Sequence, residues 1–456
     1  MNWKPYPKYR VSGIRWVSEL PEHWRVARLK RVADVRFSSV DKHSLDGEVP
    51  VRLCNYVDVY HHDHITQDLP FMPATATRAE SHRFTLRRGD VLVTKDSEEW
   101  TDIAVAAHVE QDLDGVLCGY HLAHLRPMNG VIRGDYLCRS FSARALNAQL
   151  QVEATGITRY GLGKDAIDNA LFLVPPSVDQ RAIAAFLDRE TARIDALIEK
   201  KEQQIELLEE KRGALIHHAV TRGLDPSAPL RDSSIEWIGQ IPAHGSITRL
   251  KYVTSRIEQG WSPQCESGQA GPDEWGVLKA GCANGGVFDE TENKTLPADI
   301  EPLREYEIRV GDVLISRACG TRELVGSAAL VHQVRPRLLL CDKLFRIVPR
   351  PSELIATFLV YFLGSRLSRY QLERDVQGAS GLALNIGQET VKELVIPLPP
   401  IGQQQDVAQF LDEELRTMDR LRSAVDRSIE MLHEFRTALI SAAVTGKIDV
   451  RAEATA

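Results

Sequence analysis

The sequence predicts an α+β fold in which two tandem α/β domains are separated by two long antiparallel coiled-coil helices with pseudo-twofold symmetry. Three observations support this prediction. The chain repeats itself once, each half contains short β-rich runs between turn residues, and each half ends in a long stretch with helical periodicity. A chain of 456 residues also exceeds the size of one ordinary core, so several domains are expected.

The internal repeat is visible as matching peptides in matching order. They are WVSELPEH at 16–23 and WIGQIPAH at 237–244, Gly-Asp-Val-Leu at 89–92 and 311–314, Phe-Leu-Asp at 186–188 and 410–412, and Ala-Val-Thr at 219–221 and 443–445. The separation drifts only from 221 to 224 residues, which coincidental Pro and Gly punctuation does not explain. Residues 40–80 and 261–300 share little. One scaffold is therefore expected to present two different surfaces.

Each half begins with about 170 residues of mixed character. Short apolar strands are expected at 90–94 and 312–316, where each run follows a glycine. Helical stretches are expected at 135–154 and 354–373. Each half then has an extended segment ending in a proline pair, Pro175-Pro176 or Pro399-Pro400, which stops the strand.

A long helix is expected after each proline pair, because apolar residues recur at steps of three and four. The apolar positions are Leu187, Ile194, Leu197, Leu208 and Leu215 in the first helix, and Leu411, Met418, Leu421, Val425, Leu432, Phe435 and Leu439 in the second. This spacing favours a coiled coil, in which polar Lys201, Gln204 and Lys211 weaken the first seam. The predicted division is a domain at 1–176, a helix at 177–222, a domain at 223–400, a helix at 401–446 and a tail at 447–456.

Composition excludes several classes of protein. The longest apolar run, 354–363, is too short to cross a bilayer, and the first residues lack the apolar core of a signal peptide, so we expect a cytoplasmic protein with no membrane partner. The seven cysteines form no CxxC pair, which favours reduced thiols over structural zinc. The net charge of −7 argues mildly against nucleic acid, unless basic loops are segregated from the carboxylates.

Four motifs resemble those of the specificity subunit of type I restriction-modification enzymes, and the likeness covers nearly the whole chain. They are WRVARLK at 24–30, Leu-x2-Gly-Asp-Val-Leu at 86–92, the Pro-Pro-x3-Gln helix entries that lead to Phe-Leu-Asp at 175–188 and 399–412, and Ala-Val-Thr-Gly-Lys-Ile-Asp at 443–449. The first copy of the last motif degenerates to Ala-Val-Thr-Arg-Gly-Leu-Asp at 219–225, a departure that affects only a helix end.

The resemblance implies that each domain is a target-recognition domain that reads one half of a bipartite, asymmetric site in double-stranded DNA. It implies that the two helices act as a ruler and as the docking surface for two modification subunits. Those subunits bind S-adenosylmethionine and methylate adenine, and restriction subunits that use ATP and Mg²⁺ can join them. The chain itself is then non-catalytic and holds no cofactor.

Two alternatives stay open from the residues alone: a coiled-coil adaptor that binds only protein, and a DNA-modifying enzyme with an unrecognised active site. No Asn/Asp-Pro-Pro-Tyr/Phe element of amino-methyltransferases is present, and Gly161 to Asp165 only loosely resembles a phosphate-binding loop. Pro272-Asp273 followed by Glu292-Asn-Lys294 satisfies a permissive nuclease pattern that could hold Mg²⁺. Large divergent inserts argue against the adaptor.

The segment His61-His62-Asp63-His64 is the one histidine cluster in the sequence. Neighbouring residues on a strand point to opposite faces, so these side chains seldom converge on one ion. A solvated polar loop is therefore favoured, and no metal site is predicted.

DNA contacts are expected from Arg, Lys and Asn side chains on loops beside short strands. The glycines at 156, 161 and 163 are expected to allow close approach of the backbone to phosphate. The candidates are Lys95, Arg159, Tyr160 and Lys164 in the first half, and Lys279, Arg317, Arg322, Lys343 and Asn385 in the second.

Overall fold

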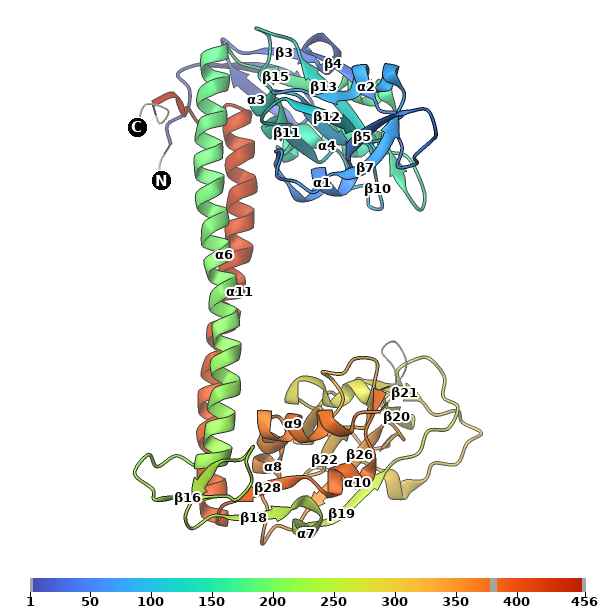
Figure 1. Cartoon of the computed structure of the whole chain (residues 1–456), viewed down its shortest axis with the longest axis vertical. Coiled ribbons are helices and arrows are strands. Elements are labelled where there is room, and N and C mark those ends of the chain that lie inside the picture. The colour runs from blue at the N-terminus through green and yellow to red at the C-terminus, as the bar shows by residue number, and fades with distance from the viewer. Residues whose placement is uncertain (1–2, 378–383, 453–456) are drawn as a thin grey trace. The chain divides into compact units, whose positions relative to one another are not determined.

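The computed structural model describes residues 3–377 and 384–452 and divides into two compact units. The first unit combines Met1–Glu202 with Asp426–Ala456, and the second spans Gln203–Val425 (Figure 1). Each unit therefore contains one recognition domain and one part of each long helix. The domain boundaries drawn from the sequence stay a prediction. Among the described residues, no helix has both the length and the apolar character needed to cross a membrane.

The first unit is built on two sheets. The five-stranded sheet has the order β4 (Ala33–Phe37), β13 (Leu122–Pro127), β9 (Val91–Thr94), β11 (Ala106–Val109) and β6 (His64–Ile65). The four-stranded sheet has the order β7 (Met72–Ala76), β5 (Val49–Cys54), β12 (Leu113–Cys118) and β8 (Thr85–Leu86). Three two-stranded ribbons complete the strands: β1 (Tyr9–Ile14) with β2 (Val17–Pro21), β3 (Arg25–Arg28) with β15 (Leu171–Val174), and β10 (Asp96–Ser97) with β14 (Tyr160–Gly161).

The second unit repeats this plan. Its larger sheet has the order β19 (Thr254–Gln259), β26 (Leu344–Pro349), β22 (Val313–Ser316) and β24 (Ala328–Leu330), and its smaller sheet has the order β21 (Asn293–Thr295), β20 (Gly276–Leu278) and β25 (Leu338–Leu339). The ribbons are β16 (Leu230–Asp232) with β17 (Gln240–Pro242), β18 (Ser246–Arg249) with β28 (Val395–Leu398), and β23 (Ala318–Cys319) with β27 (Leu384–Asn385). In both units the smaller sheet contains one parallel pair, β5 with β12 or β20 with β25.

Short helices cover the sheets in each unit. In the first they are η1 (Leu29–Arg31), α1 (Tyr56–His61), α2 (Arg78–Phe84), α3 (Gly134–Phe141), α4 (Arg144–Glu153) and α5 (Lys164–Asn169). In the second they are α7 (Leu250–Val253), η2 (Ala280–Gly286), η3 (Arg304–Tyr306), α8 (Ala356–Leu363), α9 (Arg366–Asp375) and α10 (Gln388–Lys392). Each helical stretch expected at 135–154 and 354–373 is thus two helices. In the second unit Ser365 causes the break, because its side chain caps α9.

The repeated Gly-Asp-Val-Leu peptide forms the turn into a central strand. Gly89 and Gly311 have φ of 90° and 94°, which favours glycine. The carboxylate of the next residue, Asp90 or Asp312, accepts the backbone N–H three residues earlier and closes the turn. All four residues of β9 and of β22 are buried, because alternate side chains enter two different hydrophobic cores.

The repeated Pro-Pro-x3-Gln peptide joins each recognition domain to a long helix through one buried glutamine. Gln180 is 1% exposed, and its amide nitrogen donates to the carbonyls of Pro175 (2.8 Å) and Val131 (3.0 Å). Its amide oxygen accepts the backbone N–H of Arg133 (2.7 Å). Gln404 makes the same three bonds in the second unit. The motif therefore fixes where each helix leaves its domain.

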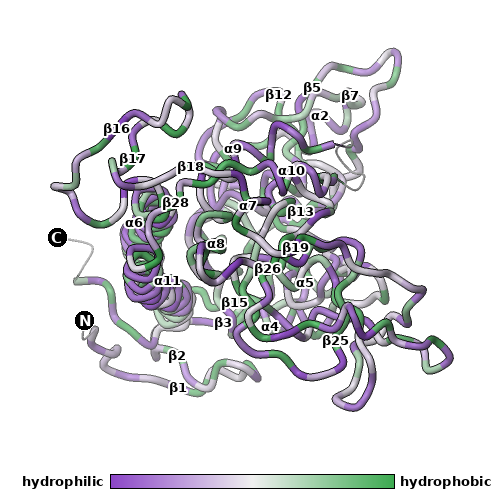
Figure 2. The backbone as a smooth tube through the Cα atoms, turned by 90° about the horizontal axis from the view of Figure 1, so that it is seen from below, coloured by the Kyte–Doolittle hydropathy of each residue, from purple (hydrophilic) through white to green (hydrophobic). Residues whose placement is uncertain are grey.

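The long helices α6 (Ser177–Arg222) and α11 (Ile401–Val444) pair antiparallel within each unit (Figure 1). In the second unit Arg212 binds Asp419 (2.5 Å), and three residues earlier on α6 Glu209 binds Arg422, three residues later on α11. In the first unit Asp195 of α6 lies 2.9 Å from Arg436 of α11. Figure 2 shows that the tube of α11 is largely hydrophilic. Charge pairs thus accompany a narrow apolar seam.

The seam differs in detail from the heptad expected from the sequence. Leu197 and Leu421 were expected to face the partner helix, but their exposed fractions are 42% and 44%. Ile198 and Val425 are buried instead. Steps of three and four both satisfy the sequence pattern, and the structure takes the longer step after Ile194.

The two units differ at one large core position. Trp24 is 1% exposed in the first unit, and its indole N–H donates to Asp179 (3.1 Å). The equivalent residue in the second unit is Gly245, whose N–H makes the same turn bond, to Pro242. A cavity of about 210 Å³ beside Gly245 lies where the indole would be expected.

Candidate nucleic-acid interface

In each unit one short ribbon carries several of the residues predicted to contact DNA. Ribbon β10–β14 of the first unit and ribbon β23–β27 of the second are antiparallel pairs at equivalent places. The residue before the first strand, Lys95 or Arg317, accepts a backbone hydrogen bond from the residue after the second strand, at 2.7 Å and 3.0 Å. The repeat therefore gives both units the same backbone frame with different side chains.

Asp96 gathers the basic side chains of the first ribbon. Its carboxylate lies 2.6 Å from Nη2 of Arg159, 2.9 Å from Nδ1 of His121 and 3.8 Å from Nζ of Lys95. Asp96 is 15% exposed, whereas Arg159 is 54% exposed. One carboxylate shared by Lys95 and Arg159 leaves the cluster with a net positive charge.

Aromatic rings surround the Lys95 ammonium group. Its Nζ lies 4.6 Å from the ring centroid of Tyr120 and 5.5 Å from that of Phe37, within the range of a cation–π interaction. Tyr160 belongs to β14 and pairs with Ser97 across the ribbon. Cations beside exposed aromatic rings are a common arrangement on surfaces that bind nucleic acids.

Lys164 lies apart from this cluster. It begins α5 and forms an ion pair with Asp168 (2.6 Å) one helical turn later. The loop before it needs glycine at Gly156 for its own turn, because a Cβ atom there would lie 2.0 Å from the carbonyl oxygen of Arg159. By contrast, nothing lies within 4 Å of a Cβ atom at Gly163.

Three predicted residues meet at the second ribbon. Asn385 pairs with Ala318 in the ribbon itself. The backbone N–H of Arg317 donates to the carbonyl of Lys343 (2.8 Å), and its guanidinium donates to the carbonyl of Asp342 (3.2 Å). Arg317, Lys343 and Asn385 thus form one group.

Lys279 joins this group, and Arg322 does not. Lys279 and Lys343 line the same surface depression, together with Lys294. Lys279 is paired with Glu292 at 3.7 Å. Arg322 instead donates to the carbonyl of Glu373 in α9 (2.9 Å).

Buried charges hold the central strands beneath each ribbon. Burial alone would raise the pKa of Asp90, but hydrogen bonds from Arg126 and His124 outweigh it, so the pKa is lowered. In the second unit Arg346 occupies the place of His124, is 1% exposed, and lies 3.3 Å from Asp312. These networks fix the strands that support the ribbons.

Sequence reasoning missed His121, Tyr120 and Phe37 in the first unit and Lys294 in the second. The repeat contained a signal for one of them, because His121 precedes the predicted Lys343 by 222 residues. Aromatic residues carry no such signal, since their contact with Lys95 depends on strand register.

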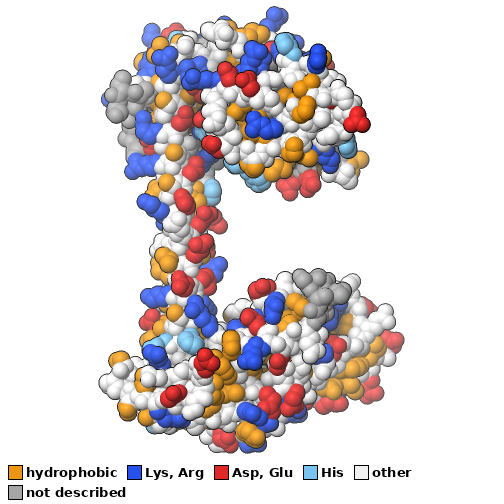
Figure 3. Space-filling view, in the orientation of Figure 1, with side chains coloured by type: hydrophobic (Ala, Val, Ile, Leu, Met, Phe, Trp, Pro, Cys, Tyr) orange, Lys and Arg blue, Asp and Glu red, His pale blue; other side chains and the backbone are white. Residues whose placement is uncertain are grey.

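The permissive nuclease pattern is not assembled into one site within the described residues. Glu292 and Lys294 line one depression, but Asp273 is not among the residues lining it. The Asp273 side chain is fully exposed and lies 3.9 Å from Arg337. On the face of each unit seen in Figure 3, Lys and Arg side chains are interspersed with Asp and Glu rather than gathered in one broad patch.

Comparisons with known proteins agree with the resemblance seen in the sequence. No family model matches the chain. The chain is 22% identical to the EcoKI specificity subunit of Escherichia coli K12 over 94% of this chain and 90% of the relative. It is 27% identical to the EcoEI specificity subunit of Escherichia coli over 54% of this chain, a match that spans only 41% of that relative.

Solved structures share the fold. A chain from a type I restriction-modification system, solved in a study of complex assembly and conformational transition, has a TM-score of 0.69 at 19% identity over 94% of this chain and 99% of that one. The HsdS subunit from Thermoanaerobacter tengcongensis has a TM-score of 0.53 at 19% identity over 94% and 98%. Sequence similarity along nearly the whole length, with the shared fold, confirms the prediction: the chain belongs to the specificity subunits of type I restriction enzymes.

Proposed function

We propose that this chain recognises a bipartite, asymmetric DNA site, one half with the ribbon β10–β14 and its cations and the other half with the ribbon β23–β27. The observation that carries the proposal is that equivalent ribbons bear unlike side chains. His121 in the first unit corresponds to Lys343 in the second, and Gly161 corresponds to Asn385. A common frame with different hydrogen-bonding groups suits two different half-sites.

Each ribbon has the chemistry to engage DNA. Arg and Lys donate to guanine edges and phosphates, and Asn can pair with adenine. Asp96 competes with phosphate for Arg159 and Lys95, so these side chains would exchange one anionic partner for another on binding. The net charge of −7 does not oppose this, because the cations lie together at the ribbons.

The family supports a role without catalysis by this chain. We propose that two modification subunits dock on it, bind S-adenosylmethionine and methylate adenine, and that restriction subunits using ATP and Mg²⁺ join them. The chain itself would contribute target choice and hold no cofactor. Its work on DNA favours the cytoplasm.

Single substitutions test the ribbon assignment. Arg159→Ala and Arg317→Ala are each expected to lower specific DNA affinity about ten- to hundred-fold, from the ~1–3 kcal/mol of a good base contact. The assay is a salt-controlled titration of the complex assembled with modification subunits.

Arg249→Ala is a matched control. Arg249 is 53% exposed and lies 2.6 Å from Glu393, which closely matches Arg159 and Asp96, but it belongs to the ribbon β18–β28. Its loss is expected to change affinity less than two-fold. Wild-type binding by both ribbon variants, or an equal loss in the control, would remove the support for the proposal.

A further inference from the structure

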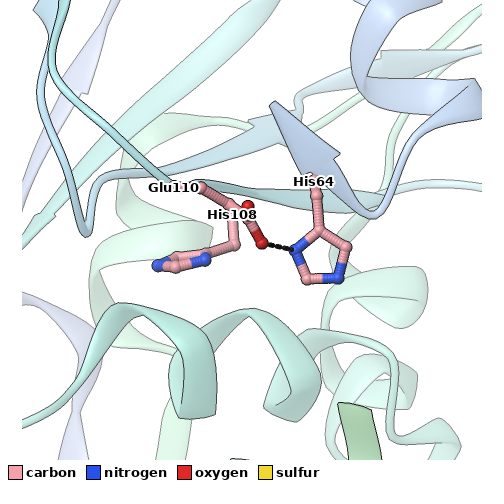
Figure 4. Close-up of side chains that lie close together, drawn as sticks. All are labelled: His64, His108 and Glu110. Carbon is pink, nitrogen blue, oxygen red and sulfur yellow. Dashed lines mark ion pairs between the residues drawn. The ribbon is translucent and has the colours of Figure 1, made fainter. Parts of the chain in front are cut away.

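Three metal-ligating side chains converge at one edge of the larger sheet in the first unit (Figure 4). His64 of β6 pairs directly with His108 of β11 in a parallel register. Glu110 follows His108 by two residues and therefore lies on the same face. One imidazole nitrogen from each histidine and one carboxylate oxygen lie within 4.8 Å of one another.

Protein contacts leave these groups incompletely satisfied. Nδ1 of His64 lies 2.8 Å from the Glu110 carboxylate, but the geometry is not that of a hydrogen bond and this buried nitrogen has no other partner. The imidazole of His108 has no side-chain hydrogen bond to another described residue. His64 and Glu110 are 38% and 47% exposed, so an ion can reach them from solvent.

The donor set suits zinc better than a hard cation. Two imidazoles and one carboxylate are typical Zn²⁺ ligands at about 2.0–2.2 Å, with water in the fourth position. Ca²⁺ and Mg²⁺ prefer oxygen ligands throughout. Ligand atoms around a tetrahedral ion lie about 3.3 Å apart, so small side-chain rotations would close the site from its present spacing.

Surrounding charges are compatible with a cation. Nη2 of Arg139 lies 3.4 Å from Nε2 of His64, a weak contact that is lost if Nδ1 binds the ion and Nε2 carries the proton. Arg139 keeps its ion pairs to Asp63 (2.7 Å) and Asp188 (2.9 Å), which offset its charge.

We propose that His64, His108 and Glu110 bind one Zn²⁺ ion that ties the edge strand β6 to β11. The ion also secures the neighbouring residue Asp63, which binds Arg436 of α11 at 2.8 Å. Zinc would thus strengthen the attachment of α11 to the first recognition domain.

The second unit has no equivalent site, which fixes the stoichiometry. Leu330 stands at the place of His108, and its parallel bridge partner is Val287, at the place of His64. His332 corresponds to Glu110. One zinc ion is therefore expected for each chain.

Metal binding to the purified full-length chain tests the proposal. Equilibrium dialysis against buffered micromolar Zn²⁺, followed by metal analysis, is expected to give one ion per chain. Glu110→Gln and His108→Asn are each expected to weaken binding at least ten-fold, while His332→Asn, the matched control, binds like wild type. Zn²⁺ should also raise the melting temperature of wild type but not that of Glu110→Gln.

Two results would overturn the inference. One is a wild-type chain that retains no stoichiometric zinc. The other is an ion retained equally by Glu110→Gln and His108→Asn, which would place the metal elsewhere, for example on thiols. Glu110 is partly exposed, so its variant is expected to fold, and circular dichroism checks this.

Discussion

Replacing Gln180 with alanine is expected to destabilise the first unit by about 3 kcal/mol. The variant loses three buried hydrogen bonds of 2.7–3.0 Å to the backbone, each worth about 1 kcal/mol. Gln404→Ala removes the equivalent bonds of 2.9 Å and should cost the second unit a similar amount. Because the glutamines join each domain to its helix, the loss should be felt locally.

Hydrogen exchange followed by mass spectrometry can separate the two units, which a single unfolding curve of a two-unit chain cannot. A loss of about 3 kcal/mol corresponds to roughly a hundred-fold faster exchange through global opening. Gln180→Ala should accelerate peptides of the first unit, and Gln404→Ala those of the second. Gln403→Ala is the control, because Gln403 bonds only to His244 in an exposed setting. Exchange in the glutamine variants no faster than in this control would refute the reasoning.

Two further predictions concern other buried positions. The lowered pKa of Asp90 means that its stabilising contribution is complete above the unfolded value, about 3.9, and is lost as the pH falls through the folded pKa. Asp90→Asn should therefore lower the free energy of unfolding at pH 7 and differ less from wild type near pH 3, and a difference independent of pH in urea unfolding would contradict this. Trp24→Ala is expected to cost about 3–5 kcal/mol through its cavity. Gly245→Trp should fill the cavity of about 210 Å³ and raise the melting temperature, and calorimetry showing a lower one would count against the equivalence of the two positions.

Much of the fold was predictable because the repeat fixes equivalences that local chemistry then explains. Gly89, Asp90 and Gln180 each make a bond that depends only on nearby backbone, and each recurs at the same offset in the second unit. The strands after Gly89 and the helix after Pro176 followed from turn and proline chemistry.

Features that depend on tertiary packing were less accessible. The step from Ile194 to Ile198 rather than Leu197 depends on how the helices pack, since both residues fit the pattern. The ribbon partners of Lys95 come from segments far apart in sequence. His64 and His108 meet only because β6 pairs with β11, so the expectation of a solvated histidine loop rested on neighbours in sequence alone.

Sequencing of modified adenines tests the central claim most directly. Cells would express this chain with its modification subunits, and the methylated sites would be read across the genome. The account predicts a two-part motif in which Arg159→Ala relaxes one part and Arg317→Ala relaxes the other. A single undivided motif, or relaxation of the same part by both variants, would contradict it.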